Sequence, residues 1–297
     1  MLLSEDQSAK GKLCKPKMVL QSTKSTYERK EEICVRTYGC LYERGRRESN
    51  QDSIALHKIV TLYGEVALAV VCDGMGGMDE GETASGYVAE RISCWFYEEL
   101  PLLLERRAGM KGIARSIERK LFHLHFDLKE YGKRKKIVTG TTASILLTTE
   151  KKYLICHLGD SAIYRINRKR AGIWRMGASY GSGSSVRWMR RFSCGRFGRT
   201  IVRMTKIHGD AASGLERCIG SGKYHPPDVR YGRVKKHTAF LLCSDGFWHH
   251  LKEEEIANTF SEGTAECGGW AEKRLRALAA KALRRGEADN ISAIYLG

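Results

Sequence analysis

Residues 65–77 read EVALAVVCDGMGG, and seven consecutive apolar residues, 66–72, lead directly into Asp73 and Gly74. An uninterrupted apolar run that is rich in β-branched residues predicts a strand buried on both faces. Such a run is far shorter than the ~18–20 residues that a membrane-spanning helix needs. The segment therefore predicts a central strand of a layered domain, with a carboxylate placed where the strand ends.

Working outward from this strand, the remaining apolar patterns predict a mixture of strands and paired helices. Ala84, Val88, Ile92 and Trp95 recur at spacings of three and four, which is typical of one buried helix face. Residues 113–128, 252–260 and 271–285 also have helical patterns, and strand composition recurs at residues 33–42, 53–59, 141–149, 153–160, 162–166, 239–245 and 290–297. Strand clusters with helices arriving in pairs predict an α+β fold of mainly antiparallel sheets, not a doubly wound parallel sheet.

The charge of the chain is concentrated in one segment. The 297 residues carry 51 Lys and Arg against 34 Asp and Glu, a net charge of +17. Residues 161–209 hold twelve Lys and Arg and no acidic residue, which is most of that excess. Within this segment, residues 167–204 lack any strand or helix period, so they predict a basic Gly/Ser/Arg-rich insertion. Residues 1–31 are polar and aperiodic and predict a mobile arm before a domain over residues 32–297.

The cysteines predict reduced thiols. None of the ten forms a CxxC pair, and Cys72, Cys156 and Cys243 lie in or at the end of apolar runs, where a thiol behaves as a small hydrophobic group. The first residues lack the basic stretch and apolar core of a secretory signal. We therefore expect a cytoplasmic protein with no transmembrane segment.

Aspartates recur at the ends of the predicted strands. They are Asp52, Asp73, Asp160, Asp245 and Asp289. Each one alone is typical of a turn. If the strand ends share one rim, however, the carboxylates converge, and divalent cations with oxygen ligands relieve their repulsion. Because His and Cys do not accompany them, Mg²⁺ or Mn²⁺ is favoured over zinc.

Six short motifs contain these aspartates and follow one another in order. They are Arg47-Glu48-Ser49-Asn50-Gln51-Asp52, Asp73-Gly74-Met75-Gly76-Gly77, Gly140-Thr141-Thr142, Gly159-Asp160-Ser161, Ser244-Asp245-Gly246-Phe247-Trp248 and Asp289-Asn290. This set resembles the metal-dependent serine/threonine protein phosphatases of the PP2C (PPM) family in their bacterial form. The resemblance runs from about residue 34 to the C-terminus, with an interruption at residues 167–235, and it implies an α-β-β-α sandwich.

The resemblance also implies a role for individual residues. Two Mn²⁺ or Mg²⁺ ions would be held by Asp52, Asp73, the Gly74 carbonyl, Asp245 and Asp289, with Asp160 and Asn290 in the surrounding shell. Arg47 would bind the substrate phosphate through its guanidinium fork. Arg47, Asp73 and Asp245 are accordingly the implied catalytic residues. The implied reaction is attack of a metal-activated water on phosphoserine or phosphothreonine, without a phosphoenzyme, in proteins phosphorylated by a serine/threonine kinase.

Three departures from the family pattern bear on the mechanism. Met75 stands where many animal members have a histidine. Residues 133–138 are basic and apolar where the family often has an aspartate for a third ion, so the resemblance implies two ions and leaves a third without this ligand. The helical flap that family members usually have beside the active site is shortened here, between His208 and Leu215. The basic insertion is a hypothetical replacement for it.

Other motifs indicate weaker alternatives. Cys40 and Arg46 have the spacing of cysteine-dependent phosphatases, but a bulky interior suits that loop poorly. Residues 220–223, Gly-Ser-Gly-Lys, predict a turn and not a phosphate-binding loop. His249 and His250 could suggest a metal, but we expect adjacent histidines to point apart at the surface.

The function itself has alternatives. A chain that keeps this fold but turns over weakly would be a phosphoprotein-binding or regulatory module. The basic insertion fits a solvated loop, a guide for acidic substrates, or a contact with nucleic acid or an acidic membrane, because it interleaves Arg with aromatic residues.

Overall fold

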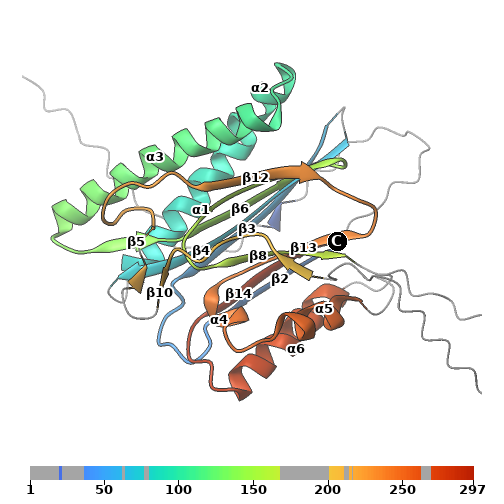
Figure 1. Cartoon of the computed structure of the whole chain (residues 1–297). Helices are drawn as coiled ribbons and strands as arrows, with labels where there is room; N and C mark the ends of the chain where they lie inside the picture. The colour runs from blue at the N-terminus through green and yellow to red at the C-terminus, as the bar shows by residue number, and fades with distance from the viewer. Residues whose placement is uncertain are drawn as a thin grey trace, which may run out of the picture.

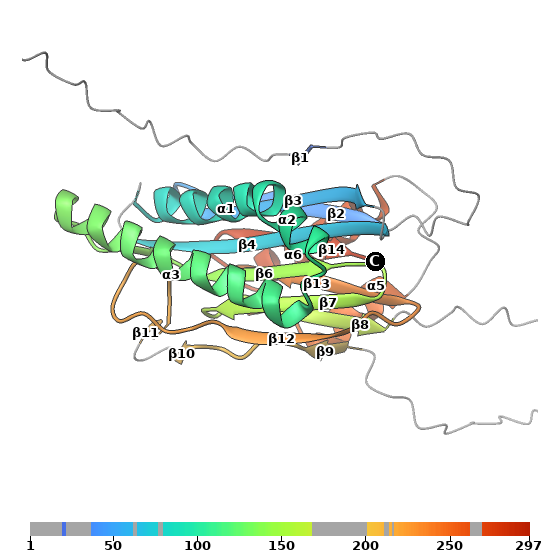
Figure 2. The same cartoon turned by 90° about the horizontal axis from the view of Figure 1, so that it is seen from above.

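Two stacked β-sheets with helices on both outer faces form the molecule (Figure 1). The computed structural model describes residues 20–21, 37–61, 64–76, 80–167, 201–210, 214–215, 217–261 and 269–297. Figure 2 looks down on one helical layer, with the sheets beneath it. The prediction of an α-β-β-α sandwich is confirmed.

The first sheet is built on the strand from which the sequence analysis started. Its order is β1-β3-β4-β6-β7-β12, and β5 pairs with the end of β4. Apart from β1, which is parallel to β3, its neighbours are antiparallel. The strands are β1 (Leu20–Gln21), β3 (Asp52–Thr61), β4 (Gly64–Gly76), β5 (Thr139–Thr141), β6 (Ala143–Thr148), β7 (Lys152–Leu158) and β12 (Asp228–Arg233).

The second sheet is antiparallel throughout, in the order β2-β14-β13-β8-β9. Its strands are β2 (Tyr38–Glu43), β8 (Ala162–Asn167), β9 (Ile201–Arg203), β13 (Thr238–Cys243) and β14 (Ile291–Leu296). A separate two-stranded pair, β10 (Gly209–Asp210) and β11 (Gly214–Leu215), lies where the shortened flap is predicted.

Three buried apolar clusters separate the four layers. The first lies between the first sheet and the helices α1 (Glu80–Glu98), α2 (Leu100–Glu105) and α3 (Met110–Lys135). The second fills the space between the two sheets. The third lies between the second sheet and the helices α4 (Asp245–Trp248), α5 (Glu253–Ser261) and α6 (Trp270–Arg284). Along β4, the even-numbered residues from 66 to 72 belong to the first cluster, and the odd-numbered residues from 67 to 71 belong to the second, so alternate side chains of this strand join two cores.

The structure differs from the sequence expectation in several places. A separate helix, α2, follows α1 directly, with Pro101 in its first turn, where proline is tolerated. The run predicted at residues 141–149 is split between β5 and β6. β12 was not predicted, because it is a half-exposed edge strand without an apolar face. β9 lies inside the interval predicted as an irregular insertion, whose residues 168–200 are outside the described part.

Two further expectations concern membranes and thiols. In the part of the chain that the structure describes, no helix is long and apolar enough to cross a bilayer. Cys72, Cys156 and Cys243 are buried and unpaired there, as their apolar neighbours predict. Of the arm predicted over residues 1–31, only Leu20 and Gln21 are described.

A buried histidine joins β7 to the loop that follows β9. His157 is 0 % exposed, and its Nε2 lies 2.9 Å from the carbonyl oxygen of Lys206 and 3.1 Å from that of Gly159. Because both neighbours are acceptors, Nε2 carries the proton, and Nδ1 accepts from the Ser144 hydroxyl at 2.9 Å. Burial and the neighbouring His208 lower the pKa of His157 to about 4.

This histidine should make the fold less stable in mild acid. Between pH 6.5 and about 4, this histidine is protonated in the unfolded chain but stays neutral in the folded protein. The free energy of unfolding therefore falls as the pH falls. The full shift corresponds to about 3 kcal/mol. We predict that His157→Gln, although less stable near neutrality, loses this part of the acid dependence in urea unfolding. The exposed-site variant His123→Gln should retain the wild-type slope, and an equal slope for all three proteins would contradict the assignment.

Candidate functional site

The strand register places two aspartates side by side on the first sheet. Asp52, the first residue of β3, pairs directly with Asp73 near the end of β4. Directly opposed residues of an antiparallel pair point to the same face of the sheet. Asp52 is 1 % exposed, so this pair brings negative charge into the interior.

The Gly-Thr-Thr motif holds the backbone of Asp73. The Thr142 hydroxyl accepts from the Asp73 N–H at 2.8 Å, and the Asp73 carbonyl accepts from the Thr142 N–H at 2.8 Å and from the Thr141 hydroxyl at 2.9 Å. Ser161 lies 3.0 Å from the Thr142 hydroxyl and joins the second sheet to this clamp. The sequence marks these residues as parts of motifs, but their role as supports of Asp73 is visible only in the fold.

Three further aspartates lie where strands of the second sheet begin or end, at the same end of that sheet. Cys243 of β13 pairs with Ala162 of β8 and with Ala293 of β14. Asp245 follows β13, Asp160 precedes β8 and Asp289 precedes β14, so antiparallel pairing brings all three to the same end of the sheet. Their charges, with that of Asp52, act on Asp73. The five aspartates predicted from the sequence are therefore gathered in one place.

This concentration of carboxylates is electrostatically unfavourable. Burial, followed by the charges of Asp245 and Asp289, raises the pKa of Asp52 to about 7. Burial and then Asp245 raise the pKa of Asp160 to about 6. The pKa values of Asp73 and Asp245 are also raised, again first by burial and then by neighbouring carboxylates. Each carboxylate thus disfavours the ionised form of the others.

The polar groups at this edge fit hard divalent cations. Neither carboxylate oxygen of Asp52 has a hydrogen-bond partner among the described residues, although both are buried, and Oδ1 of Asp160 is in the same position. Buried charges that lack partners are costly unless they are paired or bind a metal. Because the converging ligand atoms are oxygens, they suit Mg²⁺ or Mn²⁺.

Gly74 leaves no room for a side chain beside Asp73. A Cβ at this position would lie 2.1 Å from the Gly81 carbonyl oxygen, at the start of α1, and 2.6 Å from that of Gln51. The Gly74 N–H also donates to the Gln51 carbonyl at 3.1 Å. The glycine therefore lets the end of β4, the start of α1 and the residue before Asp52 meet. The predicted use of its carbonyl as a ligand stays a prediction.

Arg47 lies beside the carboxylates, on the loop between β2 and β3. Its guanidinium binds Asp289 in a bidentate pair, with Nε 2.9 Å from Oδ1 and Nη2 2.7 Å from Oδ2. The side chain is 58 % exposed. The hydrogen bonds to Asp289, and then the negative charges of Asp289, Asp73 and Asp245, favour the charged form of Arg47 and raise its pKa. Arg47 is thus close to the site where the sequence analysis expects phosphate, but in this structure its partner is a carboxylate.

Asn290 connects the loop of Arg47 to the loop of Asp289. Its amide donates to the carbonyl oxygens of Arg44 at 2.8 Å and Ser49 at 2.9 Å, and its Oδ1 accepts from the Gln51 N–H at 2.9 Å. The side chain is almost fully buried. Asn290, expected from the sequence only in the surrounding shell, therefore fixes the segment that carries Arg47.

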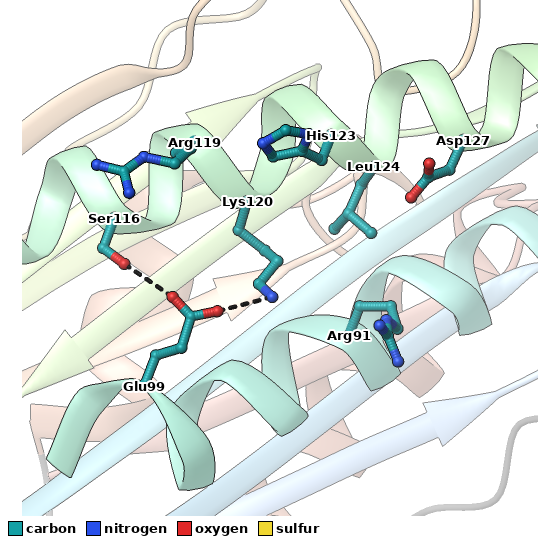
Figure 3. A pocket seen from close by; sticks show the side chains of 8 residues that line it. All are labelled: Arg91, Glu99, Ser116, Arg119, Lys120, His123, Leu124 and Asp127. Carbon is teal, nitrogen blue, oxygen red and sulfur yellow. Dashed lines mark hydrogen bonds and ion pairs between the residues drawn. The ribbon is translucent and has the colours of Figure 1, made fainter. Parts of the chain in front are cut away.

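Other candidate sites have different chemistry. A cavity of 290 Å³ lies between α1 and α3, away from the aspartates just described, and Figure 3 shows its lining. Its Glu99 is bound by Lys120 at 2.7 Å and by Ser116 at 3.3 Å. Cys40 lies in β2, where burial and then Glu272 raise its pKa to about 12, the opposite of what a cysteine nucleophile needs.

The prediction that His249 and His250 point apart is wrong. Their ring centroids lie 5.0 Å from each other, and both rings lie near Glu287. Residues 220–223 form bends, with Gly220 and Gly222 at positive φ, in agreement with the predicted turn.

Comparisons with known proteins point to one family. The family model for protein phosphatase 2C matches residues 43–284. The human integrin-linked kinase-associated serine/threonine phosphatase 2C is 24 % identical over 298 residues, covering 87 % of this chain and 71 % of the human protein.

Solved structures share the fold. The serine/threonine phosphatase Stp1 from Staphylococcus aureus is 22 % identical, with a TM-score of 0.66, and the match covers 92 % of this chain and 99 % of Stp1. The catalytic domain of the phosphatase PstP, solved in complex with 2 manganese ions, is 20 % identical, with a TM-score of 0.60, and the match covers 88 % and 97 % of the two chains.

The contacts of Asn290 lead to a direct test. Asn290→Ala removes three hydrogen bonds, so we predict a loss of about 2–4 kcal/mol in the free energy of unfolding. Trypsin should also cleave faster at Arg44, Arg46 and Arg47. The control Glu98→Ala, at an exposed position of α1, should change stability by no more than about 0.5 kcal/mol. Wild-type stability and cleavage in Asn290→Ala would show that this amide does not hold the loop.

Proposed function

The chain belongs to the protein phosphatase 2C family, and on that basis we propose that it hydrolyses phosphoserine and phosphothreonine in proteins with the help of two divalent cations. The observation that carries the proposal is the buried pair Asp52 and Asp73, whose charges are surrounded by further carboxylates. An assembly of this kind is unfavourable without cations, and a cation-loaded site suits phosphoryl chemistry.

In this proposal Asp52, Asp73, Asp245 and Asp289 hold the two ions, together with the Gly74 carbonyl. Divalent cations bound by such oxygens lower the pKa of water and neutralise charge on a phosphate group. Asp160 is a supporting carboxylate in this proposal. The charge of Asp245 raises the pKa of Asp160, so the two carboxylates belong to the same cluster. The manganese ions in PstP support this choice of metal class, and either Mn²⁺ or Mg²⁺ satisfies the oxygen ligands.

Arg47 binds the phosphate of the substrate in this proposal. A guanidinium matches two phosphate oxygens with two parallel hydrogen bonds, which is the arrangement that Arg47 already makes with Asp289. Cation binding by Asp289 would compete for that carboxylate and free the guanidinium for phosphate. Asn290 keeps the Arg47 loop in place while the partner changes.

The chemical outcome is a simple hydrolysis. The oxygen of a water molecule forms the new bond to phosphorus and the bond to the serine or threonine oxygen breaks. That oxygen takes up a proton that the attacking water gives up, so the products are inorganic phosphate and the free hydroxyl. We propose direct transfer to water without a phosphoenzyme. The substrates are proteins phosphorylated by a serine/threonine kinase, and a cytoplasmic location is supported by the unpaired buried thiols. Contacts of the basic insertion with acidic partners stay predictions, because residues 168–200 are outside the described part.

Hydrolysis of phosphopeptides and of p-nitrophenyl phosphate tests the proposal. We predict activity with Mn²⁺ and its loss with EDTA. Asp73→Asn combined with Asp245→Asn should lower kcat/KM by at least about 100-fold, since both substitutions remove proposed ligands.

The matched control is Asp127→Asn, which removes an exposed aspartate on α3 and should keep wild-type kcat/KM. Activity that persists in EDTA or in the double variant overturns the proposal. Stoichiometric Mn²⁺ binding without turnover on any phosphopeptide supports the phosphoprotein-binding module instead.

A further inference from the structure

A second group of metal-binding side chains lies at the other end of α4. The ligand atoms of His249, His250 and Glu287 all lie within 4.8 Å of one another. His250 Nε2 is 3.7 Å from Glu287 Oε2, and the two imidazole rings are inclined by 40°. Asp245 starts α4 and belongs to the carboxylate cluster, whereas these histidines follow its last residue, Trp248.

The local backbone explains why adjacent histidines converge. The helix α4 has four residues and ends at once, with the His249 N–H bound to the Asp245 carbonyl at 2.9 Å. The Leu251 N–H then binds the Trp248 carbonyl at 3.0 Å, so both histidines lie in a tight turn. In a longer helix or in a strand, neighbouring side chains would diverge.

Glu287 provides a second, independent observation, because one of its buried oxygens makes no hydrogen bond. The residue is 6 % exposed, and its Oε1 accepts from the N–H groups of Ala288 at 2.8 Å and Asp289 at 2.9 Å. Its Oε2 is buried without a hydrogen bond among the described residues, and it faces the histidines. One oxygen of a buried carboxylate therefore shapes the loop, while the other makes no hydrogen bond and has the His250 imidazole 3.7 Å away.

We propose that His249, His250 and Glu287 bind a Zn²⁺ ion at a site distinct from the aspartate cluster. Two imidazoles and one carboxylate are a ligand set typical of zinc, whereas Mg²⁺ prefers oxygen ligands. Ligand atoms at normal bond lengths from a tetrahedral Zn²⁺ lie about 3.3–3.5 Å apart. The 3.7 Å between His250 and Glu287 is already close to that spacing, and a ligand atom of the exposed His249 lies within 4.8 Å of both.

The surrounding structure holds the three ligands on a firm frame. Arg285 donates to the His250 carbonyl at 2.8 Å and binds Glu255 with both terminal nitrogens. At the start of α4, Gly246 packs so closely on the next loop that a Cβ there would lie 2.3 Å from the Asn290 carbonyl. A bound Zn²⁺ would join the end of α4 to Glu287, on the loop that carries Asp289. This inference does not depend on phosphatase activity.

Zinc binding to the full chain, measured with saturating Mg²⁺ present, tests the site. Calorimetric titration with Zn²⁺ should show one equivalent more for the wild type than for His249→Gln/His250→Gln. Glu287→Gln keeps the Oε1 acceptor but removes the charge, and it should weaken that equivalent by at least about 100-fold. The control double variant His123→Gln/His237→Asn, which removes two exposed imidazoles elsewhere, should bind as the wild type does.

A footprint locates the ion independently of stoichiometry. Zn²⁺ should protect His249 and His250 from diethyl pyrocarbonate, as read by mass spectrometry, and leave His123 and His237 reactive. Equal Zn²⁺ equivalents and affinities in the wild type and the His249→Gln/His250→Gln variant, or unchanged modification of these histidines, would overturn the proposal and leave a simple His250–Glu287 ion pair. Neither readout uses turnover, so failure here is separate from failure of the proposed function.

Discussion

Mutual repulsion among buried carboxylates is the constraint on which the rest of this molecule depends. Asp52 and Asp73 face each other across β3 and β4, and Asp160, Asp245 and Asp289 approach from the second sheet. Five carboxylates are rarely buried together between two sheets, because each buried negative charge raises the pKa of the neighbouring carboxyl groups and makes their ionisation less favourable. The apolar clusters on both sides of the first sheet and outside the second supply the stability that tolerates it. In the proposed function, bound cations would offset the repulsion among these carboxylates.

Hydrogen bonds to backbone groups keep the carboxylates in position without neutralising them. Thr141 and Thr142 hold the main chain of Asp73, and Asn290 holds the loop between β2 and β3. None of these contacts uses a carboxylate oxygen of Asp52 or Asp73. The side-chain oxygens are thus left for cations, and Arg47 remains on an anchored loop with Asp289 as its partner. The two carboxylate oxygens of Glu287 also have different roles. One accepts a hydrogen bond from the loop backbone, and the other faces the histidines.

The sequence predicts the parts of this structure that are encoded by local patterns. The buried run before Asp73, the stripes of α1 and α3, and the aspartates at strand ends give the layers and the gathered carboxylates. The edge strand β12 is not predicted, because its residues are largely exposed and do not alternate between apolar and polar. The roles of Thr142 and Asn290 escape it because their partners lie 69 and 241 residues away in the chain. The convergence of His249 and His250 escapes it because it depends on where the four-residue helix α4 ends.

The repulsion among the carboxylates is measured most directly by the free energy of unfolding of the wild type and of Asp73→Asn, with and without Mn²⁺. At about pH 8 more of the carboxylates are ionised. Without metal, Asn removes one buried charge from the cluster, so we predict that the variant is the more stable protein. With Mn²⁺ at about 100 times its dissociation constant, the wild type should gain about 2.7 kcal/mol, and the variant much less. A variant that is less stable without metal and gains as much from Mn²⁺ as the wild type would contradict the account.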